Sequence, residues 1–175
     1  MPDETAAETP MRQRILQATF KVLSRHGYGK FNLSDVAAQA GISRPTLYKS
    51  FPSKDELLSA FSQFEVQLLR EDLHRAVDGR TGRRQLDALL QFLVDFYHSY
   101  AMRGLVEIEP GLVLAQMAKT LPVLVDLIAP VLAGHVSQPE TVAMALVRLS
   151  VCHYLVPGYD DDRLLDQLRA AAGVR

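Results

Sequence analysis

The sequence of 175 residues contains one cysteine, Cys152, so no internal disulfide can form. A chain without disulfides is typical of a reducing compartment, and we expect a cytoplasmic protein. The longest apolar run, residues 121–136, is interrupted by Asp126 and falls short of the roughly 20 uncharged residues that a membrane span requires. The acidic start, with Asp3, Glu4 and Glu8 ahead of any cation, differs from a secretory signal. We therefore expect a soluble protein with no membrane partner.

β-Branched apolar residues are scarce. Val and Ile together supply 20 residues, whereas Leu and Ala supply 45. This ratio favours helix over sheet, and the apolar fraction of 48% is sufficient for a core. The composition predicts an all-α protein.

The chain also has almost no net charge, −1 in total, but the charges are unevenly distributed. Residues 10–54 hold eight cations and one anion, Asp35, whereas residues 55–175 carry a net charge of −5. Such asymmetry indicates a segment that faces nucleic acid or a membrane, and the alternative is an ordinary solvated basic surface.

Apolar spacing and capping residues predict short helices in the basic segment. A first helix begins after Pro10 and stops at Gly27. A second begins near Leu33 behind the cap Asn32, with Phe31 and Val36 placed as a hydrophobic staple. The predicted third helix covers residues 44–50, from the cap Ser43 to Ser50. A longer fourth helix is predicted to follow the capping box at Ser53.

The remainder also has helical patterning. An apolar stripe over 86–100 ends at Gly104, and two helices are predicted over 111–119 and 121–133. Ser137 is predicted to cap a helix over 141–155 that is apolar nearly all round and buried on more than one side, before a turn at Pro157 and a last helix over 163–172. The prediction is an all-α fold of about nine helices, with one domain at 1–55 and a second at 56–175.

The two short helices carry the spacing of a helix-turn-helix. Ala37 is small where the helices cross, Gly41 permits a sharp turn, and Leu47 packs the second helix on the first. The alternative is an ordinary helical hairpin. The positive charge favours a helix-turn-helix whose second helix, 44–50, enters a major groove.

Residues 12–58 resemble the DNA-binding domain of the TetR family of bacterial transcriptional regulators. The resemblance covers 47 of 175 residues. Two departures from the family pattern are Phe31-Asn32 and Lys49-Ser50, and the second means that base preference cannot be transferred. The matching positions are Ile15-Leu16-Gln17-Ala18, Gly27-Tyr28, Asp35-Val36-Ala37, Ala40-Gly41-Ile42-Ser43, Thr46-Leu47-Tyr48, Phe51, Ser53, Lys54 and Leu57.

The resemblance implies contacts with double-stranded operator DNA. Tyr48 and Lys54 are expected to contact phosphates, with Tyr48 exposed because Phe51 fills the inward position. Arg44 is expected to bind a guanine in bidentate fashion, and a plain phosphate contact is its alternative. The candidate DNA-binding residues are Ser34, Ser43, Arg44, Pro45, Thr46, Tyr48, Lys49 and Lys54.

A homodimer is expected because one such motif reads too few bases to select an operator, whereas two related by a two-fold axis read a palindrome. The interface is predicted on the helices over 141–155 and 163–172, and a monomer core helix is the alternative. Cys152 is expected to be a buried thiol rather than a redox sensor. The candidate interface residues are Ala145, Leu146, Leu149, Cys152, Leu164 and Leu168.

The family also implies a small-molecule effector of unknown identity. Possible polar anchors are His98, Glu107, Glu109 and His135, and a surface or structural role is the preferred alternative for each. The aromatic and methionine side chains that could line an apolar cavity, or simply form core, are Phe61, Phe64, Phe92, Phe96, Tyr97, Tyr100, Met117 and Met144.

The sequence thus predicts a ligand-responsive repressor released from its operator by a small, apolar effector. The alternative is a helix-turn-helix regulator controlled by a protein partner or by no effector. An enzyme is not expected, because no nucleophile–base pair, phosphate loop or paired carboxylates has a recognisable spacing. The histidines lack metal-ligand spacing, and no metal or other cofactor is expected.

Overall fold

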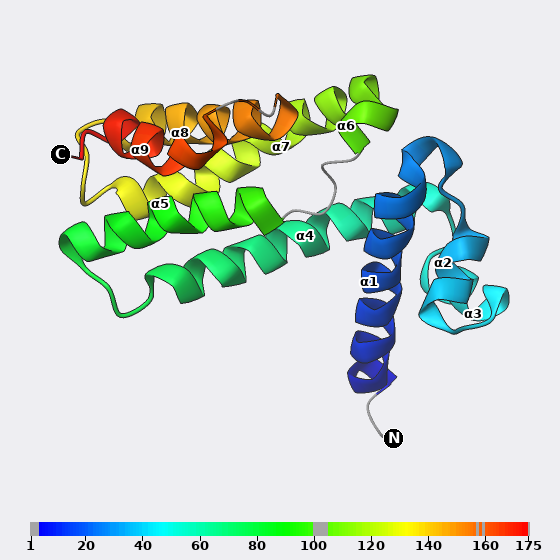
Figure 1. Cartoon of the computed structure of the whole chain (residues 1–175). Helices are drawn as coiled ribbons and strands as arrows, with labels where there is room; N and C mark the ends of the chain where they lie inside the picture. Colours follow the sequence, from blue (N-terminus) through cyan, green and yellow to red (C-terminus); the bar gives the residue numbers. More distant parts are fainter. Residues whose placement is uncertain (1–3, 100–104, 157, 159, 175) are drawn as a thin grey trace. The chain divides into compact units, whose positions relative to one another are not determined.

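The computed structural model describes residues 4–99, 105–156, 158 and 160–174, which form nine α-helices, one short 3-10 helix and no strand (Figure 1). The all-α prediction is confirmed. The chain divides into two compact units: residues 1–68 with Glu107–Glu109, and residues 69–106 with 110–175. The predicted boundary at residue 55 lies at the start of the fourth helix, whereas this division lies within that helix.

The first helix of the N-terminal unit, α1, runs from Glu4 to Lys30 and is interrupted at Gly27, whose φ of 73° and ψ of 175° are not helical. The predicted stop at Gly27 is confirmed, but the predicted start after Pro10 is wrong. Pro10 lies inside α1 and removes only one backbone hydrogen bond. The alanines and glutamates ahead of it are strong helix formers, which explains why the helix continues through it.

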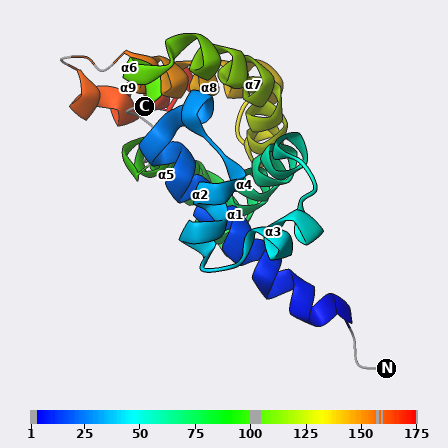
Figure 2. The same cartoon turned by 90° about the vertical axis from the view of Figure 1, so that its right-hand side faces the viewer.

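The next two helices match the predicted caps. Helix α2, Leu33–Ala40, begins where the Asn32 side chain accepts a hydrogen bond of 2.9 Å from the Asp35 N–H. It ends at Gly41, whose φ of 64° is the left-handed conformation that glycine adopts without steric cost. Helix α3, Arg44–Ser50, begins where the Ser43 hydroxyl accepts from the Thr46 N–H at 3.3 Å. Figure 2 shows α2 beside α1, with α3 following it.

Helix α4, Lys54–Val77, begins at the predicted capping box, where the Ser53 hydroxyl accepts from the Glu56 N–H at 3.1 Å. The start of α4 packs with the first three helices around one core. Burial of these apolar side chains stabilises the short helices, which are too short to persist alone. The buried residues are Ile15, Leu16, Val22, Leu23, Phe31, Val36, Ala37, Ala40, Leu47, Phe51, Leu57 and Phe61.

The C-terminal unit is a bundle in which α5, Gly82–Ser99, α7, Pro110–Leu132, α8, Pro139–Leu155, and α9, Leu164–Ala171, lie side by side (Figure 1). The short helix α6, Leu105–Ile108, precedes α7, and the 3-10 helix η2, Asp161–Arg163, precedes α9. Helix α8 contacts α5, α7 and α9 and is therefore the centre of the bundle. The predicted turn residues Gly104 and Pro157 lie outside the described residues.

Helix α7 corrects the prediction of two helices over this segment. It is continuous, with Pro122 and Pro130 inside it. Each proline removes a backbone hydrogen bond, but the apolar side chains Val125, Ile128 and Leu132 are buried on one face beyond Pro122. Their burial offsets the cost of the prolines and explains why the helix does not break.

Helix α8 corrects two further predictions. It begins at Pro139 behind Gln138, which makes no side-chain cap, rather than at a Ser137 cap, because proline is favoured in the first turn. The prediction that it is buried on more than one side agrees with its contacts with α5, α7 and α9, although Met144, Arg148 and Cys152 are exposed. The expectation of a buried Cys152 thiol is wrong for the single chain, because this residue lies on the side of α8 opposite the buried Ala143, Leu146 and Val147 and is exposed.

Candidate nucleic-acid interface

The exposed face of α3 is polar and lies over a closed core. Arg44, Thr46 and Lys49 are exposed, whereas Leu47 is fully buried and packs α3 against α2. Pro45, also exposed, occupies the first turn, where its missing N–H costs no hydrogen bond. Helix α3 thus presents a row of donors on an element whose diameter suits a major groove of about 12 Å.

Tyr48 has the placement that the sequence predicts. Its side chain is 49% exposed, while Phe51, three residues on, is 2% exposed and fills the inward position. The guanidinium of Arg12 lies 4.4 Å from the centroid of the Phe51 ring and helps to cover it. Tyr48 is consequently a surface residue and does not form part of the core.

The two serines lie at the N-terminal ends of the helices. The Ser43 hydroxyl is 2.8 Å from the Thr46 hydroxyl in addition to its role as a cap. Ser34 is half-buried in the first turn of α2. The Ser43 hydroxyl therefore caps the start of α3, and the Ser43 side chain is exposed next to this helix.

Lys54 has a structural role that sequence reasoning missed. Its ammonium donates to the backbone carbonyls of Tyr28 at 3.1 Å and Phe31 at 3.2 Å, and lies 5.3 Å from the Phe31 ring centroid. These carbonyls flank the connection between α1 and α2. Lys54 thus holds this connection, and two of its three N–H donors are already used.

Glu109 binds the same connection through the backbone N–H groups of Tyr28 and Gly29. Its Oε2 accepts from the Tyr28 N–H and its Oε1 from the Gly29 N–H, both at 2.7 Å. A Cβ on Gly27 or Gly29 would lie 2.8 Å or 2.5 Å from these oxygens, so the glycines permit the close approach. Of the two roles considered for Glu109, effector anchor and structural residue, the structure shows the second, because the carboxylate is bound to the backbone of the N-terminal unit.

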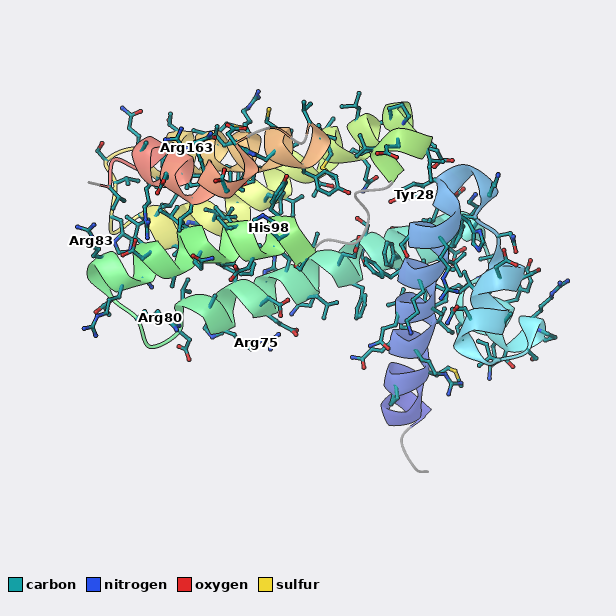
Figure 3. All side chains as sticks on the ribbon, viewed as in Figure 1. Tyr28, Arg75, Arg80, Arg83, His98 and Arg163 are labelled. Carbon is teal, nitrogen blue, oxygen red and sulfur yellow. The ribbon has the colours of Figure 1, made fainter. Side chains whose placement is uncertain are left out.

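Tyr28, labelled at the end of α1 in Figure 3, is half-buried beside this carboxylate. Burial, and then the nearby carboxylates of Glu65 and Glu109, raise the pKa of the Tyr28 phenol above its usual value of 10.0. The phenol is therefore held in its neutral form.

The cations of residues 10–54 have little negative charge beside them in the sequence. Asp35 is the one anion within residues 10–54, and its carboxylate accepts from the Asn32 side-chain amide at 2.8 Å. Arg25 donates to the Gln39 side chain at 3.0 Å. Arg44 and Lys49 are left at the surface of α3, as an interface with phosphates and base edges requires.

The candidate effector residues are divided between the two units. Phe61 and Phe64 belong to the N-terminal unit, whereas the remaining described candidates belong to the C-terminal unit. Phe92 and Phe96 stack on each other with centroids 6.3 Å apart. Met117 is half-buried on α7, Met144 is exposed on α8, and Tyr100 lies outside the described residues.

Tyr97 is part of the core rather than a free polar group. It is buried, and its hydroxyl donates to the His153 carbonyl at 2.7 Å. That carbonyl lies in the last turn of α8, where no helical N–H is available to it. His153 is also buried, with its Nε2 2.9 Å from the Gln167 Oε1. Helices α5, α8 and α9 are thus joined by a polar chain inside the bundle.

The candidate interface residues separate into two groups. Leu146, Leu164 and Leu168 are fully buried within one chain. Ala145 and Leu149 are half-buried and Cys152 is exposed. Only the second group retains surface for a partner. Among the residues that the structure describes, no three His, Cys, Asp or Glu side chains gather as metal ligands.

Comparison with known proteins identifies related sequences and folds. The family model described as "Bacterial regulatory proteins, tetR family" matches residues 15–61. The HTH-type transcriptional regulator AlkX of Mycobacterium tuberculosis is 30% identical over 106 residues, which are 61% of this chain and 50% of that protein. The chain thus spans about half the length of this curated relative.

Two solved structures extend the likeness to most of the chain. A TetR-like transcriptional regulator from Rhodococcus sp. RHA1 is 27% identical, with a TM-score of 0.60 and 93% of each chain covered. The SmeT–triclosan complex is 20% identical, with a TM-score of 0.67, and the match covers 93% of this chain and 91% of that one. The second likeness shows the fold alone.

Proposed function

Because the chain belongs to the TetR family of bacterial regulatory proteins, we propose that it regulates transcription by binding an operator through α3. The observation that carries the proposal is that Arg44, Thr46 and Lys49 are exposed on a helix that the buried Leu47 fixes to its own domain. A helix held in this way inserts as a rigid body, so its side chains reach base edges without reordering. Its place of action is the cytoplasm, where the DNA lies.

Different side chains have different tasks in this proposal. Arg44 donates to the O6 and N7 of a guanine and specifies sequence. Tyr48 binds a phosphate, as does Ser34 from the first turn of α2, and these contacts position the protein. Lys49 faces the groove. Lys54 acts mainly by fixing the connection ahead of α2, with one remaining donor for a phosphate.

The test of this proposal is a fluorescence-anisotropy titration of the purified chain with duplex DNA from the flanks of its own gene. The expected result is tighter binding to one flanking duplex than to a scrambled duplex of equal composition. Equal binding to both at every salt concentration would contradict sequence-specific recognition.

The operator-bound species in this proposal is a homodimer, since two copies of α3 separated by one helical turn read a palindrome. The expected operator has two half-sites with centres about 34 to 36 Å apart along the duplex. Bound across a promoter, such a dimer represses transcription, and a reporter gene behind the operator would be more active when the regulator is absent.

The signal in this proposal is a small apolar molecule bound by the C-terminal unit, in which the half-buried rings of Phe92 and Phe96 stack on each other. The related SmeT fold was solved as a complex with triclosan, an apolar compound, and this supports an effector of that class. A thermal-shift screen tests it: an effector raises the melting temperature and releases operator DNA in the same concentration range. If no compound in a broad apolar library both raises the melting temperature and releases DNA, this part of the proposal is wrong. The regulator is then controlled by a protein partner or has no effector.

A further inference from the structure

Ser150 on α8 carries a buried hydroxyl that has no hydrogen-bond partner. In the part of the chain that the structure describes, its Oγ is the one buried side-chain oxygen or nitrogen in this condition. Leaving a buried hydroxyl without a partner is unfavourable, so folded proteins rarely do so. Such a group binds either an ordered water or a ligand, and the surroundings of Ser150 distinguish the two.

The Ser150 side chain lies on the side of α8 that faces the interior of the bundle. Steps of three and four residues along a helix return to the same side, and the residues at these steps before and after Ser150 are buried. They are Ala143, Leu146, Val147, His153 and Tyr154. The hydroxyl therefore points into the bundle, where α8 contacts α5, α7 and α9.

The Ser150 hydroxyl does not make the local bond that hydroxyls on helices commonly make. Thr19 and Thr120 donate to the backbone carbonyl four residues back, at 2.9 Å and 3.0 Å, and Ser99 donates to the carbonyl three residues back at 3.3 Å. The corresponding acceptor for Ser150 is the Leu146 carbonyl, and it is not used. The side chain is thus oriented toward the other helices rather than along its own.

The polar groups that follow Ser150 on the same side of α8 are already bonded. The His153 carbonyl accepts from the Tyr97 hydroxyl at 2.7 Å, and the His153 Nε2 lies 2.9 Å from the Gln167 Oε1. A buried water is usually held by about two to four polar partners, and these groups leave it few beside Ser150. A ligand that is mostly apolar and carries one polar group suits this position better than a water does.

The polar group of such a ligand is neutral. Among the residues that the structure describes, no lysine or arginine is buried, and Arg148 on α8 is exposed. A buried carboxylate or phosphate without a cation beside it is strongly unfavourable. A serine hydroxyl both donates and accepts, so it can bind either a hydroxyl or a carbonyl oxygen.

We propose that the Ser150 hydroxyl binds a neutral hydroxyl or carbonyl oxygen of the effector. The effector is therefore an apolar molecule with such an oxygen, rather than a pure hydrocarbon or a carboxylate. This inference rests on the effector of the proposed function and names its chemical class and one residue that binds it. A site that bonds to an oxygen rejects the analogue that lacks it, because the protein hydroxyl is then left unpaired.

Matched ligands test this class. Naphthol and naphthalene differ by one hydroxyl, and naphthoate carries a charge instead; octanol and octanoate repeat the second comparison on an aliphatic chain. In calorimetric titrations of the wild-type chain at neutral pH, naphthol should bind at least about tenfold more tightly than naphthalene or naphthoate. Octanol should exceed octanoate by a similar factor. Tighter binding of the carboxylates, or equal binding of naphthol and naphthalene, would overturn the proposal.

Ser150→Ala removes the hydroxyl and tests its role directly. The variant should bind naphthol and naphthalene with affinities within about threefold of each other, with its naphthalene affinity unchanged. Its melting temperature should equal or exceed that of the wild type, because a hydroxyl without a partner contributes no hydrogen bond to the fold. A lower melting temperature would show that the hydroxyl is bonded in the free protein and would overturn the proposal.

Thr120→Val is the matched control in the same unit. It removes a hydroxyl that is already bonded to the Gln116 carbonyl of its own helix, so the preference for naphthol should remain that of the wild type. If Thr120→Val loses this preference as fully as Ser150→Ala does, the preference does not come from Ser150 and the proposal is wrong.

The remaining outcomes separate this inference from the proposed function. If naphthol and naphthalene bind the wild-type chain equally and both release operator DNA, the apolar effector stands and the role of Ser150 is wrong. If none of these compounds binds the wild-type chain, the chemical class named here is wrong. Operator binding by α3 is measured without an effector, so neither result alters it.

Discussion

Glu109 and Gly29 are joined by a hydrogen bond of 2.7 Å from the glycine N–H to the glutamate Oε1, across 80 residues of sequence. The companion bond from the Tyr28 N–H makes the contact bidentate. The segment Glu107–Glu109 is the one part of the chain beyond Leu68 that belongs to the N-terminal unit. The carboxylate therefore holds this distant segment to the connection that leads into the helix-turn-helix.

The first prediction concerns this contact. Glu109→Ala removes two charge-assisted hydrogen bonds and is expected to lower the free energy of unfolding by about 1 to 3 kcal/mol. Gly29→Ala is expected to cost a similar amount, because its Cβ would lie 2.5 Å from the carboxylate and displace it. Urea denaturation followed by circular dichroism measures both changes.

Because both substitutions break the same contact, the double variant should cost little more than either single one. Glu107→Ala, in the same segment with an exposed side chain, is the control and should leave stability unchanged. Fully additive effects would mean that Gly29→Ala acts through some other contact.

The second prediction separates two lysines near α3. Lys54→Ala leaves two backbone carbonyls without their ammonium partner, so it should lower the melting temperature as well as weaken DNA binding. Lys49→Ala, at an exposed position, should leave the melting temperature unchanged and weaken DNA binding. The slope of log affinity against log salt concentration should become shallower by about 1. Equal melting temperatures for the two variants would contradict the structural role of Lys54.

The third prediction concerns the C-terminal end of α8. Tyr97→Phe removes the hydroxyl that satisfies the buried His153 carbonyl, and we expect a loss of about 1 to 3 kcal/mol in the free energy of unfolding. Tyr48→Phe removes a hydroxyl from an exposed ring and should have no effect on stability. A Tyr97→Phe variant as stable as the wild type would show that the carbonyl finds another donor.

The fourth prediction is a pH dependence. The folded pKa of Tyr28 is raised above the unfolded value of 10.0, so the unfolded chain loses this proton first as pH rises. The stability that the neutral phenol contributes is fully present below about pH 10 and is lost as pH rises from there through the folded pKa. Melting temperatures should therefore fall more steeply above that pH in the wild type than in Tyr28→Phe, and parallel curves would refute the assignment.

The features that the sequence predicts correctly are those with local causes. The caps Asn32 and Ser43 and the left-handed Gly41 depend on residues within one turn of helix, and their positions match. Tyr48 could be assigned to the surface because Phe51, the C-cap residue of the same short helix, fills the inward position.

The features that the sequence misses depend on tertiary contacts. Nothing near Glu109 in the sequence indicates that it accepts a hydrogen bond from Gly29. Nothing near Lys54 indicates that its ammonium donates to the backbone carbonyls of Tyr28 and Phe31. Helix α7 continues through Pro122 because side chains beyond the proline are buried against the bundle. Leu146 and Leu164 have the same pattern whether they face a partner or their own core, and burial alone separates the two cases.

The central claim is that α3 reads a palindromic operator, and selection of bound sequences from a random pool of duplex DNA tests it most directly. The wild-type chain should enrich a palindrome with half-site centres about 34 to 36 Å apart. Arg44→Ala should enrich the same palindrome but lose its preference at one base pair in each half-site, a loss of about 1 to 3 kcal/mol of discrimination. No enrichment by the wild-type chain, or an identical motif with undiminished preference for Arg44→Ala, would contradict the account.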